Sequence, residues 1–230
     1  MLHRLTLALV AAFALTSAHA ADAPRPPADS AGADGPHPQV RIVTNDGNIT
    51  VELYPDRAPI TVANFLRYVK EGQYTQTLIH RVIPNFLIQG GGFTAPDGKA
   101  KTSHAAIANE SGNGLQNRRG FVGLARATAP HSGNSQFYIN TADNPDLDPM
   151  PARWGYAVFG KVLDGMDVVD RISTVPAGAT GVFSKDSPLT PVIIEKIELV
   201  DPKAANYTVP PEIEQQLAQP PGAGAVQAPN

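Results

Sequence analysis

One stretch of the sequence places an arginine inside an otherwise apolar, strand-like run. Residues 79–93 read IHRVIPNFLIQGGGF, with Arg81 and Gln89 among mostly apolar side chains and glycines. A guanidinium is always charged and carries five hydrogen-bond donors, so burying it without a partner is very costly. Arg81 therefore either points outward from a barrel wall or lines a pocket in which its charge is used.

Several other kinds of site fit this chain poorly. Gly90-Gly91-Gly92 lacks the spacing and the following Lys-Ser/Thr of a phosphate loop, so we interpret it as a bulge or a close backbone approach. Ser135 lacks the second glycine of a nucleophile elbow. The histidines after residue 20 show no HxH or HxxxH spacing and are scattered as His37, His80, His104 and His131. We predict no metal site.

The apolar runs predict a mainly β domain. Two alternating runs between residues 39 and 55 are joined through Asn45-Asp46-Gly47-Asn48, and Asp-Gly is a strong hairpin signal. Six more short runs follow, separated by Gly, Pro, Asn and Asp: TLIHRVI, FLIQGG, GFVGLA, SQFYINTA, YAVFGKV and VIIEKIELV.

Only two helices are expected among these strands. The apolar residues of 58–72 recur at helical spacing, with Pro59 suited to the first turn and Gly72 to the end. A second helical pattern lies near 165–174. Many short strands with two helices favour a closed antiparallel barrel over alternating βαβ units.

The N-terminus has the three parts of a secretory signal peptide. Arg4 gives a positive n-region, Leu5 to Leu15 form an apolar h-region, and Ala18-His19-Ala20 is a small-x-small cleavage site. The apolar run is too short for a span of roughly 20 residues, and the alternative of a buried N-terminal helix does not explain the ordered parts. We expect cleavage after Ala20, hence a signal peptide at 1–20 and a periplasmic protein without membrane attachment.

The composition of the rest defines one domain with two tails. Residues 21–38 and 202–230 are rich in Pro, Ala and Gly, and we expect both to be flexible, with a short marginal helix possible at 210–219. The domain then covers 39–201, which is large enough for a single core. The chain has no cysteine, so it can form no disulfide, and export without cysteine favours a bacterial periplasm.

Charge gives no sign of a nucleic-acid partner. The net charge of the chain is −3, and removal of residues 1–20 takes away one arginine and no acid. A nucleic-acid or anionic membrane partner would favour a basic patch instead. With no evident coiled coil or large apolar stretch, we expect a monomer.

Three ordered motifs resemble those of the cyclophilins, the peptidyl-prolyl cis–trans isomerases. IHRVIPNFLIQGGGFT resembles their F-H-R-x-I-P-x-F-M-x-Q-G-G-D-F-T signature. Two later segments of the family are resembled by GFVGLARATAPHSGNSQFYIN and YAVFGKVLDGMDVVDRI. The residues within these motifs are most similar to those of the bacterial periplasmic branch. The resemblance covers about residues 40–200 and implies a closed eight-stranded antiparallel β-barrel capped by two helices, as the pattern predicts.

The resemblance also implies a set of site residues. Arg81 matches the catalytic arginine, and Gln89 matches the polar residue that orients it. The proline pocket falls on Phe86, Leu87 and Tyr138. The remaining matches are the substrate-backbone groove and the far pocket wall, which fall on Ala125, Arg126 and Gln136, and on Leu147 and Tyr156. Taken singly, each apolar residue of this set would fit plain core packing; the ordered motifs favour the site.

The chemistry of such a site needs no nucleophile, metal or cofactor. Rotation about an X–Pro bond breaks amide resonance at a cost of about 18–20 kcal/mol. In the twisted state the nitrogen lone pair becomes an acceptor, and a fixed guanidinium binds that state better than either planar isomer. An apolar pocket strengthens the effect of the charge.

Two functions remain open at this point. The first is an isomerase that acts on proline-containing unfolded or partly folded polypeptides and assists the folding of exported proteins. The second is a binding module that holds such segments without useful turnover, with the tails as tethers. The joint presence of Arg81, Phe86 and Gln89 favours the enzyme.

Overall fold

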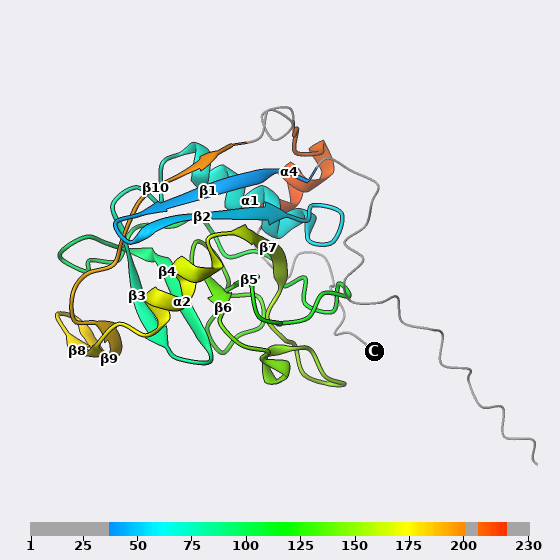
Figure 1. Ribbon diagram of the computed structural model, residues 1–230. Helices are drawn as coiled ribbons and strands as arrows, with labels where there is room; N and C mark the ends of the chain where they lie inside the picture. The colour runs from blue at the N-terminus through cyan, green and yellow to red at the C-terminus, as the bar shows by residue number, and fades with distance from the viewer. Residues whose placement is uncertain (1–36, 201–206, 220–230) are drawn as a thin grey trace, which may run out of the picture.

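The computed structural model of the protein describes residues 37–200 and 207–219 (Figure 1). The signal peptide expected at 1–20 and all but the last two residues of the linker expected at 21–38 lie outside the described residues. Within the described part of the chain, no helix has the length and apolar character needed to cross a bilayer.

Eight antiparallel strands close into a barrel in the order β1-β10-β3-β4-β6-β5-β7-β2 (Figure 1). The barrel strands are β1 (Gln39–Thr44), β2 (Gly47–Leu53), β3 (Thr77–Ile83), β4 (Leu87–Thr94), β5 (Phe121–Leu124), β6 (Phe137–Asn140), β7 (Val158–Asp164) and β10 (Ile193–Leu199). The predicted closed eight-stranded antiparallel barrel is confirmed.

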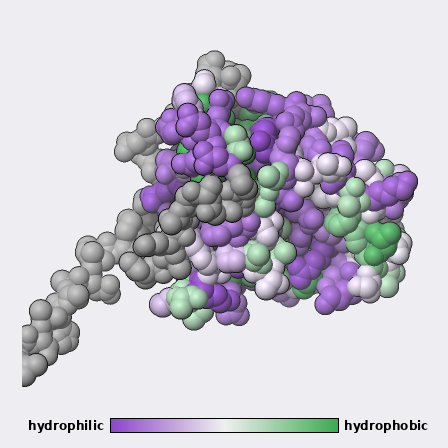
Figure 2. All heavy atoms as spheres, turned by 180° about the vertical axis from the view of Figure 1, so that it is seen from behind, coloured by the Kyte–Doolittle hydropathy of each residue, from purple (hydrophilic) through white to green (hydrophobic). Residues whose placement is uncertain are grey.

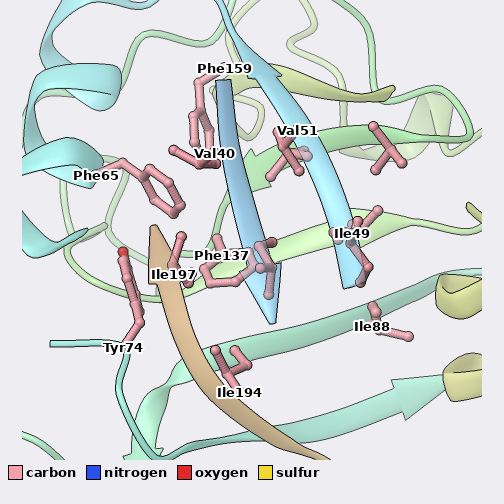
Figure 3. Close-up of a cluster of buried hydrophobic side chains, with 14 of the residues drawn as sticks. Val40, Ile49, Val51, Phe65, Tyr74, Ile88, Phe137, Phe159, Ile194 and Ile197 are labelled. Atoms are coloured by element: carbon pink, nitrogen blue, oxygen red, sulfur yellow. The ribbon is translucent and has the colours of Figure 1, made fainter. Parts of the chain in front are cut away.

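Alternate residues of the strands fill the interior of the barrel. In β1 and β2, Val40, Ile42, Ile49 and Val51 are at most 2% exposed, while their neighbours in sequence are more accessible. Successive side chains of a strand point to opposite faces, so this period of two gives one apolar face. Figure 3 shows the side chains of this cluster converging between the strands.

The two expected helices complete this core. They are α1 (Pro59–Lys70) and α2 (Met166–Ser173), and both contribute buried side chains to the same cluster as the strands. The N-cap residue of α1, Ala58, has no side chain that can cap. The carboxylate of Glu110 replaces the cap, because it accepts the N–H groups of Ile60 and Thr61 at 3.0 and 2.8 Å.

A small second sheet lies outside the barrel. It consists of β8 (Ala177–Thr180) and β9 (Phe183–Pro188), and β9 packs against β3. The ring of Phe183 stacks on His80 and meets Phe93 edge-on. The sequence patterns did not predict this hairpin, since its residues are largely exposed and carry no regular alternation of apolar side chains.

A third helix lies in the C-terminal segment that we expected to be flexible. This helix, α4 (Pro211–Ala218), coincides with the short helix expected at 210–219 and packs against α1 (Figure 1). Ile213 is 8% exposed, and Leu217 and Tyr207 pack against the main core cluster. The apolar side chains of α4 therefore hold this part of the segment on the domain.

The surface of the domain is mostly polar. Hydrophilic side chains predominate on the face seen in Figure 2. Among the described residues, the large apolar side chains that are exposed are few and come from separate segments: Met150, Leu163, Val182 and Leu189. The expectation of a monomer stays a prediction.

Burial of Ile213 gives a test of how α4 is held. Ile213→Ala removes most of a buried side chain and should lower the free energy of opening α4 by about 2 kcal/mol. Hydrogen exchange of the α4 amides should then accelerate roughly 30-fold, with the barrel amides unchanged. The matched control is Gln215→Ala, because Gln215 is exposed on the same helix. Equal exchange in both variants would show that Ile213 does not anchor α4.

Candidate active site

A β-bulge in β3 sets the direction of Arg81. Ile79 pairs with Gly90 and Arg81 pairs with Gln89, so His80 is an extra residue on β3. Ile79 and Val82 both belong to the interior cluster although they are three residues apart. Regular strand alternation, which would place His80 and Arg81 on opposite faces, is therefore interrupted. Bulges commonly re-aim side chains beside active sites.

Neutral amide groups orient the Arg81 guanidinium. Its Nη1 donates to Oε1 of Gln89 at 3.3 Å, and Nε2 of Gln89 donates to Oε1 of Gln136 at 2.9 Å. Within residues 37–200 and 207–219, no carboxylate lies within ion-pair distance of Arg81. A Cβ added at Gly92 would come within 2.6 Å of the Gln136 side chain, so glycine leaves room for this chain of contacts.

Apolar rings lie next to this charge. The ring centre of Phe86 is 6.0 Å from Cζ of Arg81. Leu87 and Tyr138 are 3% and 2% exposed but do not belong to the interior cluster. Their neighbours in sequence, Ile88, Phe137 and Ile139, belong to it instead. The Tyr138 ring lies over Gly123, where an added Cβ would come within 2.2 Å of it. Together they form an apolar layer on the outer side of β4 and β6.

The remaining predicted residues extend the same surface. The backbone N–H of Tyr156 donates to the carbonyl of Leu147 at 2.9 Å, and Leu147 ends the short helix η1 (Pro145–Leu147). The rings of Tyr138 and Tyr156 meet edge-on at 6.1 Å between centres. The N–H of Ala125 donates to the carbonyl of Gln136 at 2.9 Å. All ten predicted residues thus belong to one connected region.

The guanidinium of Arg126, a residue that we expect in the substrate-backbone groove, contacts backbone carbonyls of its own chain. Its guanidinium donates to four carbonyls of its own chain, those of Gly155, Trp154, Ala127 and Thr128. Its Cζ also lies 4.4 Å from the ring centre of Tyr156. The donors of Arg126 therefore support the segment that carries Tyr156, and sequence alone could not show that they were already engaged.

This arrangement suits binding and polarisation rather than covalent or metal chemistry. A charged donor, held by amides and bordered by apolar rings, can act on an acceptor that appears on a bound apolar group. No group of three His, Cys, Asp or Glu side chains within the described ranges is placed to hold a metal ion.

Comparison with known proteins decides the family. The family model described as cyclophilin type peptidyl-prolyl cis-trans isomerase/CLD matches residues 39–199. The chain belongs to the cyclophilin-type peptidyl-prolyl cis-trans isomerases. It is therefore an enzyme, and the alternative of a binding module without turnover is not needed.

Two bacterial peptidyl-prolyl cis-trans isomerases are similar to this chain over about 70% of its length. The chain is 49% identical to a peptidyl-prolyl cis-trans isomerase of Acinetobacter baylyi over 160 residues, which are 70% of this chain and 84% of the relative. It is 48% identical to peptidyl-prolyl cis-trans isomerase B of Escherichia coli, over 69% of this chain and 97% of the relative.

A solved cyclophilin has the same fold. The crystal structure of a Cryptosporidium parvum cyclophilin, obtained in the presence of the dipeptide Ala-Pro, aligns with a TM-score of 0.61 and 30% identity. The alignment covers 71% of this chain and 99% of the solved chain.

Sequence reasoning missed three buried asparagines behind the cyclophilin site. These are Asn117, Asn140 and Asn144, each at most 7% exposed. Asn144 donates its side-chain amide to the carbonyl of Phe86 at 2.8 Å, so it holds the backbone that carries a predicted site residue. Asparagine is frequent in loops, and the sequence carried no signal to show which of its many asparagines fold inward.

His80 packs against a different set of residues from Arg81. It is 8% exposed, and its ring lies 4.6 Å from that of Phe93 and 5.5 Å from that of Phe183. Burial, together with the smaller effect of the neighbouring Arg81 charge, lowers the pKa of His80 to about 4, although a backbone hydrogen bond with Leu78 acts to raise it. The folded protein therefore holds this imidazole neutral, which agrees with a structural role.

The lowered pKa of His80 makes stability depend on pH. A folded-state pKa of about 4 lies below the ordinary value of 6.5, so stability is full above pH 6.5 and declines as pH falls toward 4. The loss from this residue should reach about 3 kcal/mol, at 1.36 kcal/mol per pKa unit. Denaturant unfolding should show this decline in the wild type and a shallower one in His80→Phe, which keeps a ring between Phe93 and Phe183.

The control for this measurement is the exposed His104. His104→Gln should retain the acid-side decline of the wild type. If His80→Phe and the wild type lost stability in parallel between pH 6.5 and 4, burial of a neutral His80 would not be the cause.

Proposed function

We propose that this isomerase acts on proline-containing segments of exported proteins and assists their folding in the periplasm, with Arg81, Phe86 and Gln89 as its catalytic residues. The observation that carries the residue roles is the amide-oriented guanidinium of Arg81 beside the ring of Phe86. The Cryptosporidium relative, studied with Ala-Pro, supports an X–Pro dipeptide as the recognised unit.

Arg81 would act on the amide nitrogen of the twisted bond. As the X–Pro amide rotates out of plane, the lone pair of its nitrogen is no longer shared with the carbonyl and becomes a hydrogen-bond acceptor. The guanidinium donates to this nitrogen and so binds the twisted state more tightly than the ground states. Gln89 holds the guanidinium in place beforehand, so little reorganisation is needed during rotation.

The neighbouring side chains would hold the substrate. Phe86, Leu87 and Tyr138 offer an apolar layer for the proline ring, and Leu147 with Tyr156 bounds it on the far side. Nε2 of Gln136 offers a donor, and the carbonyl of Ala125 an acceptor, for the peptide backbone. Arg126 supports Tyr156 through its contacts with Trp154 and Gly155.

The cellular site of action rests on the sequence of the N-terminus. A positive residue, an apolar run and a small-x-small site occur in that order within residues 1–20. Such a segment directs export, and unfolded exported chains present X–Pro bonds that isomerise over tens to hundreds of seconds. An isomerase delivered to the same compartment would remove this delay.

Replacement of Arg81 tests the catalytic role. Arg81→Ala removes a preorganised donor, and such a loss costs about 2.7–4 kcal/mol, or about 10²–10³ in rate. Arg81→Lys should recover only part of this, because a mobile ammonium replaces a rigid planar fork. In a protease-coupled assay kcat/KM should fall sharply, while binding of a proline peptide in its ground state changes little.

A melting curve for each Arg81 variant separates catalysis from folding. The matched control is Arg171→Ala, because Arg171 is an exposed arginine on α2 that pairs with Asp167. This control should keep the activity of the wild type. A folded Arg81→Ala protein with more than about a third of wild-type activity would remove Arg81 from the mechanism.

Export can be tested directly on the mature protein. Expression of the full chain in a Gram-negative host should place it in the periplasmic fraction, with Ala21 as its first residue by N-terminal sequencing. Replacing the apolar residues Leu7 and Leu9 by arginine should keep the chain in the cytoplasm, because the h-region is then interrupted. Export would be contradicted if the unaltered chain were absent from the periplasmic fraction, or if N-terminal sequencing returned Met1 as the first residue.

A further inference from the structure

The hydroxyl of Tyr138 is a polar group in an apolar layer. The side chain is 2% exposed, and burial raises its pKa well above the ordinary value, so the hydroxyl remains a proton donor. Leaving a buried donor without an acceptor is unfavourable, so the position of this ring depends on where its hydroxyl finds a partner. The partner is Oδ1 of Asn117, at 2.5 Å.

Asn117 is itself fixed on every side. It is 1% exposed, and its backbone N–H and its Nδ2 both donate to Oδ1 of Asp148, at 2.7 and 2.9 Å. Its carbonyl accepts the N–H of Asn144 at 2.7 Å. Because the backbone N–H, the backbone carbonyl and Nδ2 of Asn117 are all held by neighbours, its Oδ1 has one defined orientation. In that orientation it accepts from Tyr138 and, at 3.4 Å, from Nδ2 of Asn140.

These contacts join two sides of the proposed substrate site. Asp148 directly follows η1, whose last residue is Leu147. Leu147 accepts the N–H of Tyr156, and the Tyr156 ring meets that of Tyr138. The path from Tyr138 through Asn117 and Asp148 to Leu147 and Tyr156 therefore closes on itself.

We propose that Asn117 is a positioning residue for the isomerase reaction: it fixes the Tyr138 ring beneath the substrate proline and couples it through Asp148 to the wall formed by Leu147 and Tyr156. Asn117 acts through Tyr138 and does not touch the substrate. The inference rests on the proposed role of Tyr138 in holding the proline ring. Since that ring is held alike in ground and transition states, loss of its position should raise KM more than it lowers kcat.

The hydroxyl makes a specific rescue experiment available. In Asn117→Ala the Tyr138 hydroxyl loses its acceptor and must turn toward another, which displaces the ring. In Asn117→Ala combined with Tyr138→Phe there is no donor left to satisfy, and removal of both partners is often nearly neutral. The phenyl ring then stays over Gly123 through packing alone.

The experiment measures kcat and KM for a proline-containing tetrapeptide in a protease-coupled assay, with a melting curve for each variant. Asn117→Ala should raise KM about tenfold with kcat within threefold of the wild type. The double variant should return KM to within about twofold of Tyr138→Phe alone. Its melting temperature should stay low, because the side-chain hydrogen bonds of Asn117 with Asp148 and Asn140 remain lost.

Two controls define the outcome. Asn64→Ala removes another fully buried asparagine, one that lies on α1 and donates to the carbonyl of Asn134, and should lower stability with KM unchanged. An unchanged KM in Asn117→Ala, or a double variant as impaired as Asn117→Ala, would overturn the positioning role while leaving the proposed site intact. An unchanged KM in Tyr138→Ala would instead reject the proposed substrate site, and the positioning role with it.

Discussion

The site depends on a permanent charge that is oriented without being neutralised. A carboxylate beside Arg81 would hold the guanidinium firmly, but its charge would cancel the field that a twisted amide nitrogen experiences. The neutral oxygen of Gln89 supplies direction at a smaller electrostatic cost, and Gln136 fixes Gln89 in turn. The apolar ring of Phe86 borders the same group, where the effective dielectric is lower than in water. Orientation by amides and an apolar border therefore work together.

Backbone features of the barrel make this arrangement possible. The bulge at His80 separates two inward residues, Ile79 and Val82, by three positions and releases Arg81 from regular alternation. Glycines at 92 and 123 leave the space that the Gln136 side chain and the Tyr138 ring occupy. A larger residue at either position would have to displace one of these side chains. The absence of a side chain at these two glycines is therefore as necessary for the site as the residues that line it.

The sequence predicted the barrel, because the patterns that indicate it are local. The site residues were instead implied by the resemblance of three ordered motifs to those of the cyclophilins. Alternation in β1 and β2, the Asp46-Gly47 turn and helical spacing after Pro59 are properties of neighbouring residues. The bulge at His80 depends on how β3 pairs with β4, and the docking of α4 on α1 depends on contacts between residues far apart in the chain. Arg126 shows the same limit, since its type suggests substrate contact while its engagement with Gly155 and Trp154 appears only in the folded chain.

The same physical solution recurs on the two sides of the substrate layer. On one side the amide oxygen of Gln89 accepts a hydrogen bond from Arg81, and on the other the amide oxygen of Asn117 accepts one from Tyr138. A side-chain amide accepts a hydrogen bond at its oxygen and donates one from its nitrogen, so a further partner can fix the amide that orients the donor. Gln89 donates to Gln136, and Asn117 donates to Asp148. Of these two series of hydrogen bonds, the one from Tyr138 through Asn117 ends on a carboxylate, that of Asp148. The group that it positions is the neutral hydroxyl of Tyr138, so the negative charge of Asp148 does not cancel a catalytic cation. The placement of the acid behind Tyr138 rather than behind Arg81 is thus what the electrostatics of the reaction require.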